Sequence, residues 1–228
     1  MDNGYGDGGG VAINGTDMAW VDSRSHHHRG NNGHGITVGC GASRVWIEGN
    51  TLEYNDEDGF QSGHRCQGNE PDEIYFYNNI CNNNRENCSD YKWVDRVVEA
   101  NNVARNHRRA SSGTATTYDD GSTGAVVNSG SDGTGLVVGS DGTPNTVFLF
   151  NNTYEDNAGC IRVEDAVDVY VYGMNCRDSD VGMKFDKSGH TRLVDSNFER
   201  AGTMINTTWR DVIRVSESGN VMIDTEYR

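Results

Sequence analysis

The sequence predicts an all-β solenoid, in which short strands stack in successive turns, from three observations. A unit of alternating apolar residues, followed by Asn or a small residue and one more apolar residue, recurs along the chain. A second strand-like run, which usually opens with Gly, precedes each copy and keeps the same period. Helical periodicity is almost absent. Repetition at this length indicates stacked supersecondary units, and alternation with period two indicates strands.

The repeating unit is clearest in the segment from Ile74 to Asn102, where two copies flank a polar stretch. We assign the inward-facing residues of these copies as Ile74, Phe76, Asn79 and Cys81, and as Arg96, Val98, Asn101 and Val103. With the Asn position as marker, the series runs 23, 50, 79, 101, 152, 174, 196 and 226. We interpret the long step between 101 and 152 as two turns, which gives about nine turns in all.

Composition supports one solenoid domain over residues 1–228. The chain has 29 Gly and only two Pro, as expected where every turn is tight and ladder hydrogen bonds must be kept. Hydrophobic content of 34% and a net charge of −15 would also suit a disordered chain, but the regular alternation argues against disorder. We expect residues 110–133, rich in Ser, Thr, Gly and Asp, to form a loop insertion. We also expect the sequence to be a fragment that lacks at least its C-terminal cap.

The strong negative charge limits the partners. It repels polyphosphate, so we expect no nucleic-acid partner. No apolar run reaches the ~20 residues of a membrane-spanning helix, and no signal peptide opens the chain. The acidic composition, with only three Lys, is typical of proteins from salt-adapted (halophilic) organisms, or equally of an ordinary acidic secreted protein. Oligomeric state stays open.

Six cysteines allow 15 pairings if all are oxidised. None forms a CxxC pair, which argues against a zinc site. Cys81 and Cys176 occupy an apolar slot of the repeat, and we interpret them as buried thiols. Cys40 and Cys66 follow equivalent strands on consecutive turns and are the best candidates for a disulfide.

The first candidate for chemistry is Gly33-His34-Gly35. It resembles a motif of the polygalacturonases, right-handed β-helix enzymes that hydrolyse pectin with three Asp residues. In that family the motif lies one turn after a pair of Asp residues, whereas here it lies one turn before Asp56, Glu57 and Asp58. We therefore treat glycoside hydrolysis as the less favoured reaction. The simpler interpretation of His34 is an exposed residue beside a strand-opening glycine.

The strongest indication of a functional site is the segment Glu86-Asn87-Cys88-Ser89-Asp90-Tyr91-Lys92. It lies one turn after Asp56, Glu57 and Asp58, which we call the acidic corner. It resembles the Glu-Asn-x-x-Asp-x-Lys segment of right-handed parallel β-helix proteins of the pectate-lyase-like superfamily. It is similar, less closely, to alginate lyases and chondroitinase B. The resemblance implies a right-handed parallel β-helix. It also implies Ca²⁺-assisted β-elimination, in which Lys92 abstracts a proton and an Arg assists.

Carried over to this chain, the resemblance assigns the catalytic roles to Lys92 and to Arg108 or Arg109. Oxygen ligands for Ca²⁺ would come from the acidic corner and the following turn, namely Asp56, Asp58, Glu86 and Asp90. Residues near this segment that we expect to contact substrate are Arg85, His64, His107 and Trp93. Lys92 would act as a base only with a lowered pKa, and the alternative is a simple surface pair with Asp90.

The sequence therefore predicts a carbohydrate-active protein, in its sharpest form a Ca²⁺-assisted lyase that acts on an acidic polysaccharide. The alternative is a non-catalytic β-helix module, such as a glycan-binding surface protein, an adhesin or a tailspike-like spacer. Because a fold does not confer an activity, both remain open at this point. The resemblance implies an extracellular or cell-surface location and no membrane partner.

Overall fold

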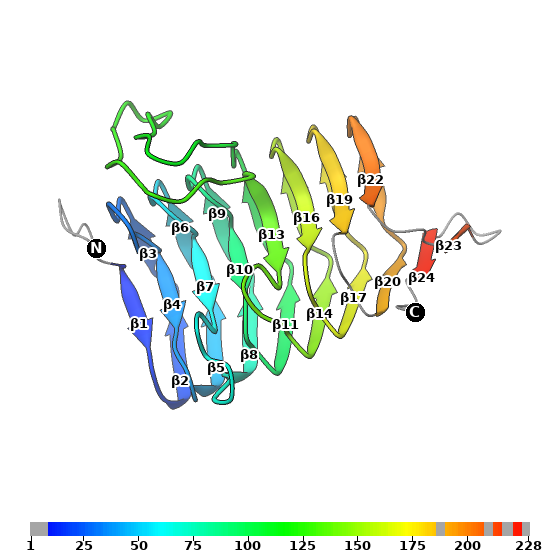
Figure 1. Cartoon of the computed structure of the whole chain (residues 1–228), viewed down its shortest axis with the longest axis horizontal. Helices are drawn as coiled ribbons and strands as arrows, with labels where there is room; N and C mark the ends of the chain where they lie inside the picture. Colours follow the sequence, from blue (N-terminus) through cyan, green and yellow to red (C-terminus); the bar gives the residue numbers. More distant parts are fainter. Residues whose placement is uncertain (1–8, 186–189, 208–211, 216–220, 225–228) are drawn as a thin grey trace.

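Three parallel sheets run along the protein and enclose one narrow core (Figure 1). The structure is a computed structural model, and it describes residues 9–185, 190–207, 212–215 and 221–224. Successive strands enter sheets A, B and C in turn, and each pairs in parallel with its counterparts one turn away. The described residues contain strands and no helix, which confirms the predicted all-β parallel solenoid.

Sheet A contains β1 (Val11–Ile13), β4 (Ile36–Val38), β7 (Phe60–Ser62), β10 (Ser89–Tyr91), β13 (Thr134–Val138), β16 (Gly159–Val163), β19 (Val181–Phe185) and β22 (Thr203–Thr207). Sheet B contains β2 (Thr16–Val21), β5 (Ser43–Glu48), β8 (Asp72–Tyr77), β11 (Arg96–Ala100), β14 (Thr146–Phe150), β17 (Asp168–Tyr172) and β20 (His190–Val194). Sheet C contains β3 (Arg24–His26), β6 (Thr51–Glu53), β9 (Ile80–Asn82), β12 (Val103–Arg105), β15 (Thr153–Glu155), β18 (Asn175–Arg177) and β21 (Asn197–Glu199). Among the described residues, no helix has the length and the apolar character needed to span a membrane.

The solenoid has about seven turns, not the nine predicted. β11 pairs directly with β14, so the step of 51 residues is one turn with an excursion at residues 106–133. At the other end, β23 (Val212–Val215) and β24 (Val221–Asp224) pair antiparallel. The last copy of the unit is therefore not a further parallel turn, and its marker, Glu226, lies outside the described residues.

The inward side chains of the repeat form a continuous apolar column. Most predicted inward residues are buried, among them Val45, Ile47, Leu52, Ile74, Phe76, Cys81, Val147, Leu149, Tyr154, Val169, Val171 and Cys176. One turn differs. There the inward residues are Val97, Glu99 and Asn102, and the predicted Arg96 and Val98 point outward. The prediction for this turn was wrong by one residue, because it excluded a carboxylate from the core.

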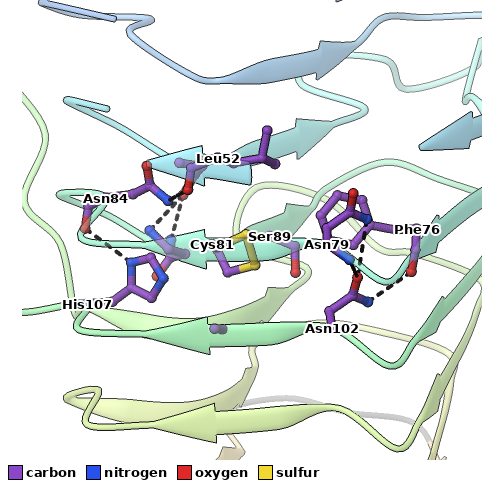
Figure 2. The surroundings of a disulfide bond; sticks show 12 residues. Leu52, Phe76, Asn79, Cys81, Asn84, Ser89, Asn102 and His107 are labelled. Atoms are coloured by element: carbon purple, nitrogen blue, oxygen red, sulfur yellow. Dashed lines mark hydrogen bonds between the residues drawn. A yellow bond between two sulfur atoms is a disulfide. The ribbon is translucent and has the colours of Figure 1, made fainter. Parts of the chain in front are cut away.

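Buried Asn side chains form two ladders along the turns between strands. One ladder contains Asn50, Asn79, Asn102 and Asn152, and the other contains Asn55, Asn84, His107 and Asn157. Asn79 is typical. Its Oδ1 accepts from the N and Nδ2 of Asn50, and its Nδ2 donates to Ile47 O and Asn102 Oδ1 (Figure 2 shows the Asn79–Asn102 step). The ladders satisfy backbone groups that the turns would otherwise leave unpaired in the core.

A carboxyl group lies inside the solenoid at Glu99. Ser89 Oγ and Tyr91 OH donate to its Oε2 at 3.0 and 2.7 Å. Within the described residues, Glu99 Oε1 has no hydrogen-bond partner. Burial raises the pKa of Glu99 to about 7, although both hydroxyl donors lower it. The carboxyl group of Glu99 is therefore neutral in acid and becomes charged inside a mainly apolar column as pH rises through about 7.

All six cysteines form disulfides. Cys40 pairs with Cys66 across two turns, as predicted. Cys81 pairs with Cys88, and Cys160 pairs with Cys176, so the prediction of buried thiols at Cys81 and Cys176 was wrong. Both positions are buried, as expected, but sequence spacing did not reveal the partner cysteines, of which Cys88 directly precedes β10 and Cys160 lies on β16, both in sheet A. Figure 2 shows Cys81 between the two ladders.

The excursion at residues 106–133 folds back over the N-terminal turns (Figure 1). Its inner anchor is Asp56, which is fully buried. Asp56 accepts from Tyr118 OH at 2.7 Å and Ala125 N at 2.7 Å, and from Arg29 and Gly30 N on the preceding turn. These contacts make the excursion a fixed wall beside sheet A.

Candidate functional site

Three consecutive turns bring polar side chains into register on the outer face of sheet A. Ile36, Phe60 and Ser89 are Cα partners in β4, β7 and β10. His34 and Asp58, two residues before the first two of these partners, therefore lie side by side, and Asn87 continues the row. The His34 Nδ1 and Asp58 Oδ2 atoms are 3.3 Å apart, and Asn87 Nδ2 donates to Asp58 Oδ1 at 2.8 Å.

Asp58 is the buried centre of this row. Its side chain is inaccessible to solvent, and it also accepts from the Asn87 backbone N and from Gln61 Nε2. Burial by itself would raise the Asp58 pKa. The His34 hydrogen bond and charge, with the charge of Lys92 and the Asn87 amide, lower that pKa below its ordinary value. Asp58 is therefore a fixed negative charge.

His34 is held between two carboxylates. Its Nε2 lies 2.7 Å from Glu57 Oε2, and its Nδ1 faces Asp58. Burial would lower the His34 pKa, but the pairs with Asp58 and Glu57 raise it to about 10. The interpretation of His34 as an exposed turn residue was wrong, because the side chain is 4% exposed.

Two further carboxyl groups face this centre from the next turn. Burial and the charge of Asp58 raise the pKa of Glu86 to about 8, and the same causes raise the pKa of Asp90 to about 7. Ser129 Oγ donates to Glu86 at 2.5 Å, and Ser140 Oγ donates to Asp90 at 2.9 Å. We call Glu57, Asp58, Glu86 and Asp90 the acidic cluster.

Lys92 lies beside the acidic cluster, directly after β10. Its Nζ donates to Asp141 Oδ2 at 3.0 Å and lies 3.4 Å from Asp90 Oδ2. Burial would lower the Lys92 pKa, but the charges of Asp90, Asp58 and Asp141 raise it above its ordinary value. In this arrangement Lys92 holds its proton, whereas a base at neutral pH needs a lowered pKa. Its catalytic role stays a prediction.

Two predicted site residues, His107 and Arg108, lie away from the acidic cluster, whereas Arg85 contacts it, with its Nη1 3.4 Å from Glu86 Oε1. Arg85 is buried and donates to Ser111 O and Ser129 O, so it holds the base of the excursion. His107 is buried in a ladder, where burial lowers its pKa to about 4. Arg108 pairs with Asp156.

The remaining predicted residues lie around the site. Trp93 packs against the backbone at Gly142, where a Cβ would lie 2.6 Å from the indole ring. His64 lines a cavity of about 300 Å³ at the N-terminal side of the acidic cluster. Arg109 lines a second cavity of about 250 Å³ on the C-terminal side. The substrate-binding roles of these residues also stay predictions.

The predicted Ca²⁺ ligands do not form one site. The oxygens of Asp56 accept from four protein donors beneath the excursion, and those of Asp58 accept from the His34 row. Glu86 and Asp90 face Ser129 and Ser140. Over the described ranges of the chain, no group of three or more His, Cys, Asp or Glu residues is arranged to hold a metal ion. These residues therefore do not fit the predicted ion.

Sequence reasoning missed His34, Glu57 and Asn87 as parts of one site, together with Ser129 and Asp141 from the flanking loops. A signal did exist for the first three: each lies one or two residues before the Gly or Cys that directly precedes a strand of sheet A. The loop residues carried no such periodic signal. Searches of family models, curated proteins and solved structures found no match to this chain, so membership of the pectate-lyase-like superfamily stays a prediction.

Proposed function

We propose that the outer face of sheet A binds a glycan and that the acidic cluster hydrolyses a glycosidic bond there. One observation carries the proposal. Glu86, whose pKa is raised to about 8, lies on the turn next to Glu57, which is ion-paired with His34. The two residues are linked by Glu86 N donating to Glu57 O at 3.3 Å. Glycoside hydrolysis requires such a pair, one carboxylic acid and one carboxylate.

Each residue then has a defined task. Glu86 holds a proton at neutral pH and gives it to the leaving glycosidic oxygen. Glu57 takes a proton from the attacking water, or it attacks the sugar carbon to form a covalent intermediate that water, deprotonated by Glu86, then hydrolyses. Asp58 raises the pKa of Glu86 by its charge, and His34 holds Glu57 in place. The Ser129 hydroxyl orients the Glu86 carboxyl.

The β-elimination implied by the family resemblance is the rival reaction. Elimination requires a base that removes the proton from the substrate carbon next to its carboxylate. The candidate base is Lys92. The ion pairs with Asp90 and Asp141 oppose that role, because they stabilise the protonated amine. We therefore favour hydrolysis over elimination, and the two reactions differ in their products.

The test is an assay of wild-type protein on neutral and acidic polysaccharides that records new reducing ends and ultraviolet absorbance in parallel. Hydrolysis yields reducing ends without absorbance, whereas elimination yields an absorbing unsaturated uronate. We expect Glu86→Gln to lower the hydrolysis rate by about 100-fold or more, as for loss of a general acid. Glu155→Gln, on sheet C and paired with Arg177, is the matched control.

Three results would reject the proposal. Absorbance that disappears in Lys92→Ala would establish elimination. Full activity in Glu86→Gln would remove the assigned acid. Binding of glycans by the folded protein without any cleavage would establish the non-catalytic module.

A further inference from the structure

The outer face of sheet A changes chemical character along the solenoid. One outward residue per turn is in register from β1 to β19, and the row reads Ala12, Thr37, Gln61, Asp90, Val137, Arg162 and Lys184. Neighbouring strands are spaced by ~4.8 Å, so a ligand lying along this row would meet one side chain per step. Uncharged side chains precede Asp90, and after Val137 the row ends in two cationic side chains, Arg162 and Lys184 (Figure 1 shows the strand order).

The lining of the N-terminal cavity offers no cationic side chain that could pair with an anionic ligand. Its lining includes the apolar Val11, Ala12 and Val38 and the amide side chains of Asn32 and Gln61.

Its two histidines do not alter this character. His34 is already paired with both Glu57 and Asp58. Burial and the neighbouring charge of Lys92 lower the pKa of His64, which favours the uncharged imidazole. An anionic group in this cavity would lie beside the acidic cluster without a cation to pair with it.

The C-terminal cavity has the opposite character. Its lining includes three cationic side chains, Arg109, Arg162 and Lys184, and one carboxylate, Asp132. Arg162 and Lys184 share Asp132 at 2.7 and 3.9 Å, and Arg162 is also paired with Glu164. Arg109 has no ion pair within the ranges that the structure describes. Guanidinium groups bind carboxylates through paired hydrogen bonds, so this cavity suits an anionic group.

We propose that the outer face of sheet A takes a heteroglycan, with an uncharged sugar unit over the N-terminal cavity and a carboxylate-bearing unit over the C-terminal cavity. This rests on the proposed function in one respect, that the glycan lies across the acidic cluster between the two cavities. A neutral glycan makes no ion pair with the cations of the C-terminal cavity. A glycan charged at every unit places an anion beside the carboxylates of Glu57 and Asp58. A glycan in which charged and uncharged sugar units alternate can place an uncharged unit at the N-terminal cavity and a carboxylate at the C-terminal cavity.

The test is calorimetric binding to Glu86→Gln, so that turnover does not consume the ligand. Three hexasaccharides serve as probes: cellohexaose is neutral, hexagalacturonate is charged at every unit, and a hyaluronan hexasaccharide alternates glucuronate with N-acetylglucosamine. We expect the alternating probe to bind about tenfold or more tighter than the other two, the value of one charge-assisted contact. This advantage should shrink at high salt.

In the Glu86→Gln background, the further substitutions Arg109→Gln and Lys184→Gln should remove the difference in affinity between the alternating probe and cellohexaose. Arg44→Gln, which loses an exposed pair with Asp17 on sheet B, is the matched control and should leave it unchanged. Equal or tighter binding of hexagalacturonate, an unchanged preference in the double substitution, or no binding of any probe would each overturn the inference. Charge-selective binding without cleavage by wild type would reject the hydrolysis and leave this inference standing.

Discussion

Replacing the buried Glu99 by Gln should change how the stability of the protein depends on pH. The Glu99 pKa is raised from 4.5 to about 7, because the side chain is fully buried. At 1.36 kcal/mol per unit, this is about 3.4 kcal/mol of penalty for the ionised form. The folded pKa lies above the unfolded one, so the stability that the neutral carboxyl contributes is complete below pH 4.5 and lost as pH rises through 7.

Between pH 5 and pH 8 these two pKa values give a loss of about 2.5 kcal/mol of unfolding free energy from Glu99 alone. Glu99→Gln has no such titration. The unfolding free energy of the variant minus that of wild type should therefore rise by about 2.5 kcal/mol over this interval. A constant offset from the altered hydrogen bonds does not affect the slope.

The assay is urea unfolding followed by tryptophan fluorescence at several pH values, with the disulfides intact. Tyr91→Phe is the second variant. It removes a donor that lowers the Glu99 pKa, so its stability should fall more steeply with pH than that of wild type. Parallel pH profiles for wild type and Glu99→Gln would refute the reasoning, because they would show that Glu99 does not titrate in this range.

Three further predictions concern other buried polar groups. Asn79→Ala should lower the unfolding free energy by about 2–4 kcal/mol, because four side-chain hydrogen bonds are lost in the core, and a loss below 1 kcal/mol in urea unfolding would contradict this. Tyr118→Phe removes a donor to Asp56 and should expose residues 106–133 to limited proteolysis several-fold faster, at unchanged far-ultraviolet dichroism. With the His34 pKa raised to about 10, its stabilising contribution is full below pH 6.5 and lost as pH rises toward 10. The stability advantage of wild type over His34→Gln should therefore shrink above pH 6.5, and an advantage independent of pH would argue against the ion pairs.

The solenoid was predictable from sequence because its cause is local and periodic. Alternating residues such as Val45 and Ile47 define an inward face, and the same spacing returns in each turn. The number of turns was less accessible. A spacing of 51 residues is compatible with two turns or with one turn that carries an insertion, and only the pairing of β11 with β14 distinguishes them.

The site was only partly predictable, for two physical reasons. Glu86, Asp90 and Lys92 were found because their segment resembles a known motif and contains one of only three Lys residues in the chain. The role of His34 was missed because a single His beside glycines carries no information about what its imidazole faces. Its partners are decided by register between turns, and a shift of one residue moves a side chain to the other face of the strand.

The contribution of the excursion could not be derived from sequence at all. Ser129 reaches Glu86 from a segment whose composition indicated only a loop. The same holds for Glu99, because patterns of hydrophobicity exclude a carboxylate from the core, whereas the hydroxyl donors Ser89 and Tyr91 on the preceding strand of the same turn allow it.

The way the sheets are built also determines where this protein tolerates rearrangement. Each strand bonds only to the turns on either side, so the turns from β16 to β21 form an extension that gene duplication or deletion could lengthen or shorten. The three turns that begin with His34, Asp58 and Asn87 are different. Their side chains bond from one turn to the next, and removing the middle turn would delete the shared carboxylate while leaving every ladder around it able to re-form. The N-terminal half of the solenoid is therefore indivisible for chemical reasons, although its backbone is as modular as the rest.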